Sequence, residues 1–383
     1  MNFTDRCNQP GVIRWFGFDS QADIQPFIYS GASTPVVDTA VKASGAGSIL
    51  FTIPSNSAAN TSGGFSINFT PGSLNYSDTD SYPVQFGEGG EFFIQWRQRF
   101  SQDFVTRYYK GAEGWKQTII GTGDRTGVPA YSCTQLEVVT VNSYHRGFPE
   151  MYHSCGVKDG QYEGLDIPFG AYDYKLQNAV DGCNYTLVHS SSSRAGYIPP
   201  CIGYKADQWM TFQVHVKVGT WYKNDHVYHK DSWIQLWVAE EDKPSVLVID
   251  RNPANSTGYD LVNVENINDK YGKIWLLPYN TGKDATEVHP TGYTWYDELI
   301  ISRNKIPDPG ALSTLHEFNH VGSVYRPEHI VIYDLRGRII KKGVHLRLNK
   351  NKHLVMDDIP NGMYLMMHKE GSRNIVKRVM VGR

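Results

Sequence analysis

The sequence predicts an all-β protein, with one large sandwich or barrel followed by a second, smaller β domain. Three observations support this prediction: many short runs rich in β-branched and aromatic residues, clusters of Gly, Pro, Asn and Ser between them, and no convincing helical periodicity. The chain has 383 residues, which is long enough for both domains.

The strands of the large domain follow one another through residues 1–305. They are expected at 47–55, 64–71, 91–100, 115–123, 134–142, 210–219, 232–240, 273–279 and 294–303. Residues 156–205 are the exception, because they form a long, Tyr- and Gly-rich stretch with little pattern. A loop of that length is usually functional or held by disulfides.

Composition places a boundary near residue 305. All nine Trp and all five Cys lie at or before Trp295, whereas five of the eight Met lie at or after Met356. Residues 323–383 carry 13 Lys and Arg against 5 Asp and Glu, a balance of +8, and the rest of the chain carries 24 against 34, a balance of −10. We therefore expect a domain over 1–305, a linker over 306–322 and a domain over 323–383. The basic residues of the last domain are not interleaved with aromatic ones, so no nucleic-acid partner is expected.

The C-terminal domain alternates short β-type runs with turns, and three of its segments are distinctive: IYDLRGRII at 332–340, IPNGMYL at 359–365 and the basic IVKRVMVGR at 375–383. In order, spacing and position this segment resembles the C-terminal sorting domain of the type IX secretion system. The resemblance implies an immunoglobulin-like β-sandwich that is recognised by the type IX machinery. It also implies an extracellular or outer-surface location in a Bacteroidota-like bacterium.

Two observations bear on export. The first ten residues, MNFTDRCNQP, contain no apolar signal core, so we expect the numbering to begin after a removed leader. No run approaches the roughly 18 apolar residues of a membrane-spanning helix, so no membrane span is expected.

The cysteines favour an oxidising compartment. Pairing of Cys133 with Cys155, and of Cys183 with Cys201, would close two short loops, although the sequence does not determine the connectivity. Cys7 is left over, either as a buried free thiol or as the site of an intermolecular bridge.

Alternation within the strands predicts a binding face. Side chains alternate across a strand, so several strands have one aliphatic face and one face of Arg, Gln, His, Lys or aromatic residues. Aromatic rings stack on the apolar faces of sugars, and Gln and Arg bind hydroxyls or carboxylates. A glycan groove is therefore predicted from Arg99, Trp233, Gln235, Trp237, Lys273 and Trp275. In the alternative, these rings pack beneath a second layer, and Arg97 and Arg99 pair with acidic loops.

Four segments carry a further resemblance: WMTFQVHVKVGTW, WIQLWVAEEDKPS, YGKIWLLPYNTGKD and YTWYDELIISRNKIPDP. Over most of 11–308 the chain resembles the concanavalin A-like jelly rolls of polysaccharide lyases. Jelly-roll alginate lyases place an Arg-rich strand, a Gln-Ile/Val-His strand and a Tyr/Lys strand around one cleft. Gln213-Val214-His215 matches the second of these motifs. The Arg-rich strand here has Gln95 in an outer position, and the spacing from Lys273 to Tyr279 is longer than in the family.

The resemblance implies β-elimination of a uronate polymer, with four catalytic candidates. Arg97 and Gln213 would neutralise the substrate carboxylate, His215 would abstract the C5 proton, and Tyr279 would protonate the leaving oxygen. The alternative for His215 is a hydrogen-bonded histidine on a polar strand face. Hydrolysis is disfavoured, because no strand carries the Glu-x-Asp-x-(x)-Glu pattern of jelly-roll glucanases.

Two further predictions concern cofactors and a different class of function. No cofactor is required, and a structural Ca²⁺ ion is compatible with the fold class, with the carboxylates of 77–81 as one source of ligands. The alternative function is a non-catalytic surface structural or adhesive protein. Its two oppositely charged domains would then attract head to tail into a homo-oligomer or filament.

Overall fold

The computed structural model describes most of the chain in separate stretches, and the account below is restricted to them. They are residues 1–31, 33–57, 63–72, 83–107, 109–110, 115–122, 136–140, 149–153, 202–220, 229–255, 270–280, 282–310, 331–333, 338–342, 360, 362–370 and 373–381. The chain divides into a unit over Phe3–Ile306 and a unit that contains Pro307–Arg383 with Met1–Asn2. Each unit is described by itself.

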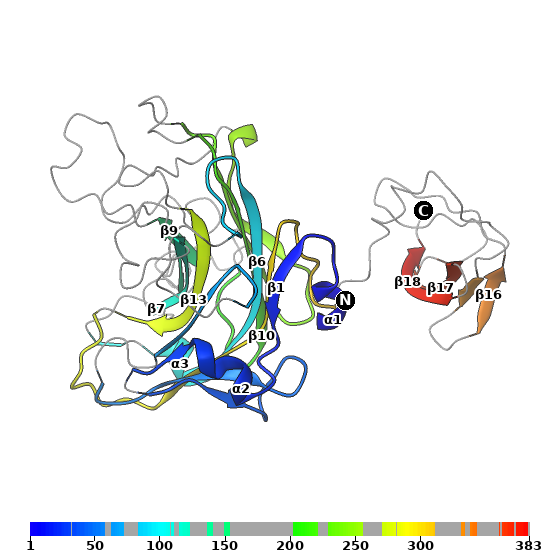
Figure 1. Cartoon of the computed structure of the whole chain (residues 1–383). Helices are drawn as coiled ribbons and strands as arrows, with labels where there is room; N and C mark the ends of the chain where they lie inside the picture. Colours follow the sequence, from blue (N-terminus) through cyan, green and yellow to red (C-terminus); the bar gives the residue numbers. More distant parts are fainter. Residues whose placement is uncertain are drawn as a thin grey trace, which may run out of the picture. The chain divides into compact units, whose positions relative to one another are not determined.

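The larger unit is a sandwich of two antiparallel sheets, which confirms the all-β prediction (Figure 1). Sheet A has the order β12-β11-β10-β6-β14-β4-β3, with β1 also paired to β14. The bounds of these strands are β1 Val12–Phe16, β3 Val36–Asp38, β4 Ser48–Ile53, β6 Glu91–Phe100, β10 Trp209–Lys217, β11 Trp233–Ala239, β12 Val246–Arg251 and β14 Gly292–Ser302.

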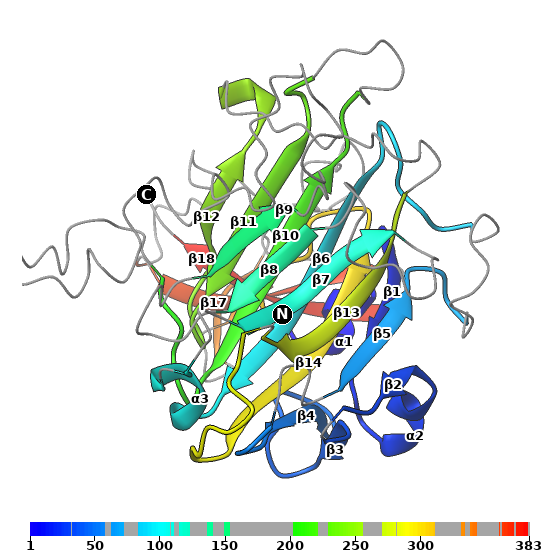
Figure 2. The ribbon, with the colours of Figure 1, turned by 90° about the vertical axis from the view of Figure 1, so that its left-hand side faces the viewer.

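Sheet B has the order β2-β5-β13-β7-β8-β9. Its strands are β2 Ile28–Tyr29, β5 Gly64–Asn68, β7 Trp115–Thr122, β8 Leu136–Thr140, β9 Glu150–His153 and β13 Tyr271–Tyr279. Figure 2 looks toward this sheet, where β8, β7, β13 and β5 run side by side. Sequence patterns predicted nine of these strands, whereas β1, β2, β3, β9 and β12 were not predicted.

The core fills the space between the two sheets. Alternate residues of β6 point into it, and Phe92, Ile94 and Trp96 are fully buried there. Facing residues such as Phe65 and Ile274 come from sheet B. The predicted inward face of β6 is therefore confirmed, and residues of opposite parity on β6 and β10 lie on the outer face of sheet A.

The larger unit also contains short helices. They are α1 Phe3–Cys7, α2 Gln21–Ile24 and α3 Gln102–Thr106, with 3-10 turns at Gln25–Phe27 and Pro253–Asn255. Ser20 and Ser101 cap α2 and α3 by accepting backbone N–H groups from Asp23 and Phe104. Within the described part of the chain, no helix is both long enough and apolar enough to cross a membrane.

The C-terminal unit contains a four-stranded antiparallel sheet of order β16-β15-β17-β18. The strands are β15 Val331–Tyr333, β16 Ile339–Lys342, β17 Gly362–Glu370 and β18 Arg373–Val381. Ile332 at the centre of β15 is fully buried. The linker proposed at 306–322 lies mostly outside the described residues, as do Cys133, Cys155, Cys183 and Cys201.

Candidate functional site

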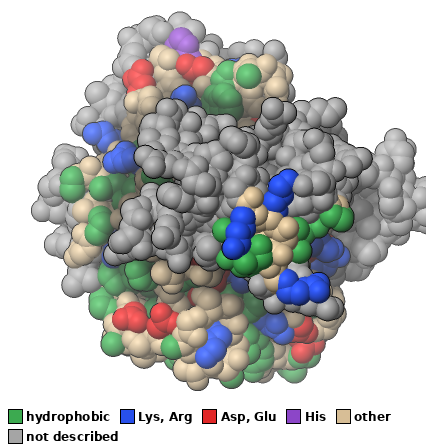
Figure 3. Space-filling model, turned by 90° about the vertical axis from the view of Figure 1, so that its right-hand side faces the viewer, with side chains coloured by type: hydrophobic (Ala, Val, Ile, Leu, Met, Phe, Trp, Pro, Cys, Tyr) green, Lys and Arg blue, Asp and Glu red, His purple; other side chains and the backbone are tan. Residues whose placement is uncertain are grey.

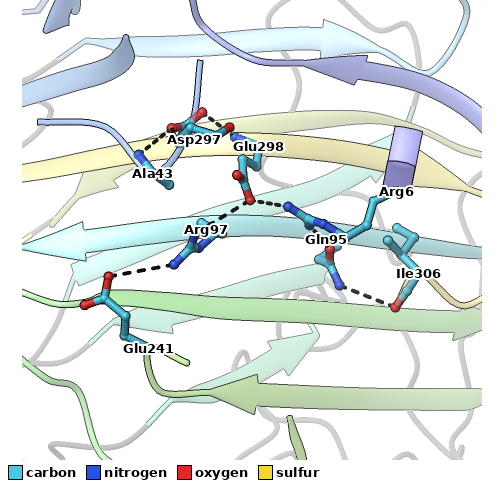
Figure 4. A network of polar contacts seen from close by, with 9 residues as sticks. Arg6, Ala43, Gln95, Arg97, Glu241, Asp297, Glu298 and Ile306 are labelled. Atoms are coloured by element: carbon cyan, nitrogen blue, oxygen red, sulfur yellow. Dashed lines mark hydrogen bonds and ion pairs between the residues drawn. The ribbon is translucent and has the colours of Figure 1, made fainter. Parts of the chain in front are cut away.

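A buried ionic network lies on the outer face of sheet A, at strands β6 and β14 (Figure 4). The fully buried guanidinium of Arg6, on α1, donates to the carboxylate of Glu298 on β14 and to the amide oxygen of Gln95 on β6. Arg97 lies at the edge of this network, 3.9 Å from Glu298 and 4.0 Å from Glu241. Two arginines therefore compensate Glu298, whose isolated burial would be very costly.

The network sits at an irregularity of β14. The pairing of β14 with β6 shifts register between Asp297 and Ile300, and Glu298 has a φ of 52°, in the left-handed region. Asp297 is fully buried and accepts the backbone N–H groups of Ala43 at 2.8 Å and Ser44 at 3.1 Å. Burial, with a smaller contribution from the charge of Glu298, raises the pKa of Asp297 to about 7. A strained residue next to a perturbed carboxyl is common at functional sites, but here both groups are sealed beneath other elements.

Gln213 was predicted to bind the substrate carboxylate, but its side-chain amide is hydrogen-bonded to the backbone. Its amide oxygen accepts the N–H of Ile306 at 2.8 Å, and its amide nitrogen donates to the carbonyl of Ile306 at 3.1 Å. Gln95 donates to the same carbonyl at 3.4 Å. The segment that follows β14 therefore lies over this part of the predicted groove, and Gln213 is almost fully buried.

The ring of His215, the predicted base, also contacts neighbouring side chains through its face and both of its nitrogens. Its ring stacks on Phe93 with centroids 4.2 Å apart, Nδ1 lies 2.7 Å from Oε1 of Gln235, and Nε2 lies 2.9 Å from a carboxylate oxygen of Glu91. Gln235 donates its own N–H to Asp250 at 2.6 Å, which orients its oxygen toward His215. Both ring nitrogens of His215 therefore face oxygen atoms of neighbouring side chains. This arrangement is the hydrogen-bonded histidine of the alternative interpretation.

The aromatic and cationic groups predicted to bind glycan on sheet A are packed in a similar way. Trp237 belongs to a small apolar cluster with Phe93, Ile300 and Ile306, and Lys305 lies over its ring at 4.1 Å. Trp233 contacts His215 edge-on at 6.0 Å. Arg99 remains 26 % exposed and pairs with Asp207 at 3.6 Å. These contacts match the alternative in which rings lie under a second layer and arginines pair with acidic groups.

The structure places Tyr279 on the other sheet, which corrects the expectation of a single cleft. Arg97, Gln213 and His215 share the outer face of sheet A, whereas Tyr279, Lys273 and Trp275 belong to β13 in sheet B. The four predicted catalytic residues therefore do not converge. Alternation along a strand reveals which residues share a face of that strand, but it does not reveal which strands share a sheet.

The outer face of sheet B carries a compact set of rings and cations. Trp275 and Leu277 pack with Ile119 of β7 and with Tyr279 in a cluster separate from the main core. The ammonium of Lys273 lies 4.2 Å from the ring centre of Trp275, and that of Lys116 lies 5.0 Å from the ring centre of Tyr279. Lys116 was not among the predicted residues, although the alternation of WKQTIIGTG already placed it opposite Trp115 and Gln117.

Strand register pairs Trp275 with a residue of each neighbouring strand. These residues are Ile119 on β7 and Ser66 on β5. Lys273 is likewise paired with Asn68 and with Gly121. Ser66, Asn68 and Lys273 are each less than one-twentieth exposed. Polar side chains thus lie buried beside Trp275 on a face that does not belong to the sandwich core.

No group of three His, Cys, Asp or Glu side chains is close enough to hold an ion in the part of the chain described here. The carboxylates at 77–81 lie outside that part, and the buried Asp297 is already capped by backbone N–H groups. Cys7 is a free, half-buried thiol, and burial raises its pKa to about 12.

Comparison with known proteins identifies the C-terminal segment. Residues 315–382 match the family model of the secretion system C-terminal sorting domain. The chain therefore carries a type IX sorting domain, and it is exported to the cell surface or the extracellular space. No curated protein matches the chain.

Several solved structures are similar to this chain. An alginate lyase from Aplysia kurodai shares 12 % identity at a TM-score of 0.44, covering 77 % of this chain and 99 % of its own. An alginate lyase from Chlorella virus shares 13 % at 0.41, over 76 % and 100 %. An endo-β-1,4-glucuronan lyase from the fungus Trichoderma reesei shares 11 % at 0.40, over 75 % and 94 %. At these identities and TM-scores the likeness assigns neither an activity nor a substrate to this chain.

Proposed function

We propose that the exported protein binds an acidic polysaccharide across the outer face of sheet B. The observation that carries this proposal is the pairing of a cation with a ring at two places on that face, Lys273 with Trp275 and Lys116 with Tyr279. An aromatic ring next to an ammonium suits a uronate sugar, which presents an apolar ring face and a carboxylate together.

The polar groups beside Trp275 support the same proposal. Lys273 is only 4 % exposed, and Ser66 and Asn68 beside it are also buried. A face that binds sugars uses hydroxyl, amide and ammonium groups to contact their hydroxyls and carboxylates.

The two pairs also suit a chain longer than one sugar. Trp275 and Tyr279 are four positions apart on β13, which corresponds to about 13 Å along an extended strand. This spacing exceeds the length of one sugar unit. A linear uronan lying along β13 would therefore present different sugar units to the two cation–ring pairs.

Cleavage by β-elimination is the enzymatic form of this proposal. A chain bound on sheet B would lie across the sandwich from Gln213 and His215, so these residues would not take part. The carboxylate would instead be neutralised by a lysine of sheet B. The hydroxyl of Tyr279 would give its proton to the leaving oxygen and take the C5 proton in exchange, as the C4–O bond breaks and the C4–C5 double bond forms. Incubation with polymannuronate, polyguluronate and polyglucuronate, while following the absorbance of unsaturated ends, tests cleavage. If the protein binds one of these polymers without cleaving it, the protein is a glycan-binding protein and not a lyase.

Self-assembly into a surface structure is the alternative, and it rests on the opposite net charges of the two parts of the chain. Figure 3 shows described Lys and Arg side chains, and described Asp and Glu side chains, each at several separate places. Several charges are also paired locally, such as Lys110 with Asp284 at 2.8 Å. Size exclusion at low and high salt separates the alternatives: a monomer under both conditions counts against charge-driven assembly.

A further inference from the structure

We propose that β16 is a docking surface of the sorting unit for a protein of the export machinery whose apolar groove has an acidic rim. The surface consists of Arg338, Ile339, Ile340, Lys341 and Lys342, and is called the β16 patch below. It belongs to the C-terminal unit, so it is independent of the glycan face proposed on sheet B.

The β16 patch lies at an edge of its sheet. On one side β16 pairs with β15, through Val331 with Lys342 and Tyr333 with Ile339. On its other side, no strand among those described pairs with it. Edge strands are where a sheet accepts contacts from another chain.

Two consecutive isoleucines of the patch are exposed. Ile339 is 51 % exposed and Ile340 is 42 % exposed, whereas Ile332 on the neighbouring strand is fully buried. The pairing shifts register between Ile332 and Tyr333, so β16 contains one extra residue opposite this step. The sheet therefore buries its own central isoleucine but leaves an apolar pair on its edge, which is the pattern expected of a protein-binding site.

Charge indicates which kind of partner fits. Arg338 and Lys342 are exposed at the two ends of the patch, and Lys341 is half-buried between them. Pairing of two copies through β16 would bring these like charges together, which is unfavourable. An apolar groove with carboxylates at its rim would cover the isoleucines and meet the basic ends at the same time.

The family match of this unit indicates which class of protein would bind the β16 patch. Residues 315–382 form a sorting domain, so the function of this unit is to be recognised during export. A surface that is apolar, basic and located on an edge strand of that unit is suited to such recognition.

The test uses the full chain, expressed in a bacterium that possesses the type IX system. The double variant Ile339→Thr/Ile340→Thr keeps β-branched side chains but removes most of the apolar surface. We expect its exported fraction to fall by about tenfold or more, corresponding to the loss of about 1.4 kcal/mol of binding. Val288→Thr, at a 74 % exposed apolar position of the sandwich unit, is the matched control and should be exported normally.

Two further variants separate recognition from folding. Lys342→Glu should also reduce export, and Lys342→Arg should not, because only the first reverses the charge at the end of the patch. Limited proteolysis of the retained double variant should show a tail as resistant as that of the wild type. Normal export of the double variant would overturn the proposal, and so would retention accompanied by a tail that is digested much faster than the wild type.

Discussion

Gln213 and Ile306 form a closed pair of hydrogen bonds, in which the side-chain amide of one residue binds both backbone groups of the other. The pair resembles the exchange between two strands of a sheet, and it anchors the chain as it leaves β14. A residue used in this way has a structural role that a purely sequence-based motif, Gln-Val-His, does not disclose.

The first prediction concerns this pair. Gln213→Ala leaves the buried N–H of Ile306 without its acceptor, so the free energy of unfolding should fall by about 1–3 kcal/mol. Urea denaturation followed by tryptophan fluorescence measures the change. Gln25→Ala, at an exposed glutamine whose side chain makes only a 3.3 Å contact with Gln21, is the matched control and should change stability by less than about 0.5 kcal/mol. Equal effects of the two substitutions would show that the Ile306 pair contributes nothing special.

A second prediction concerns the ion pair of Arg6 with Glu298. Arg6→Met leaves the carboxylate of Glu298 buried with only the more distant Arg97, at 3.9 Å, to compensate it. Removing one partner of a buried pair typically costs about 3–5 kcal/mol, and we expect a loss of this order in thermal or urea unfolding.

The control for this prediction is an exposed pair of the same kind. Lys243 contacts Glu240 at the surface, so Lys243→Met should change stability by no more than about 1 kcal/mol. The double variant Arg6→Met/Glu298→Gln should recover part of the stability lost in Arg6→Met, because it removes the uncompensated charge. A double variant that is less stable than Arg6→Met would contradict this explanation.

The pH dependence of stability supplies a third prediction. The pKa of Asp297 is about 7 in the folded protein and 3.8 in its ordinary state, so between these values the folded state holds the proton more tightly than the unfolded state. Lowering the pH through this window should therefore stabilise the protein through Asp297. The cost of ionising the buried carboxyl is fully present above pH 7 and is lost as the pH falls toward the unfolded value.

Asp297→Asn isolates this contribution. The amide cannot ionise, so the difference in melting temperature between wild type and variant should shift in favour of the wild type as the pH falls from about 8 to about 5. Other groups titrate equally in both proteins and cancel in the difference. A difference that stays constant over this range would show that Asp297 does not change protonation there.

Side-chain alternation predicted a large part of the fold. The inward set of β6 and the strand character of β10, β11, β13 and β14 follow from local pattern, because burial between two sheets selects apolar residues at every second position. The sorting domain could also be predicted from the sequence, since its three segments are distinctive in order and position.

The candidate site was harder to predict from the sequence, for two physical reasons. Tyr279 could not be assigned to a sheet, because β13 pairs with β5 and β7, and this pairing is set by contacts remote in sequence. Arg6 lies in a five-residue helix without a pattern, and its partner Glu298 is 292 positions away. No sequence pattern near either residue indicates a buried network. The burial of the outer face of sheet A beneath α1 and Ile306 could therefore not be predicted.

A fourth prediction separates cleavage from binding on sheet B. Tyr279→Phe removes the hydroxyl that would protonate the leaving oxygen but keeps the ring beside Lys116. If the protein is a lyase, the rate of formation of unsaturated ends should fall by at least about a hundredfold, whereas the affinity for the polymer should change little. Parallel loss of affinity and rate would instead indicate that the hydroxyl serves binding.

The most direct test of the account is a comparison of one lysine from each sheet. Lys116→Met removes a cation from the face of sheet B, and Lys217→Met removes a half-exposed cation from the outer face of sheet A, where it lies 3.8 Å from Glu91. Affinity for a uronate oligosaccharide, measured by calorimetry on the folded variants, should fall about tenfold or more in Lys116→Met and remain unchanged in Lys217→Met. The reverse result, full binding by Lys116→Met and weakened binding by Lys217→Met, would place the ligand on sheet A and contradict the account.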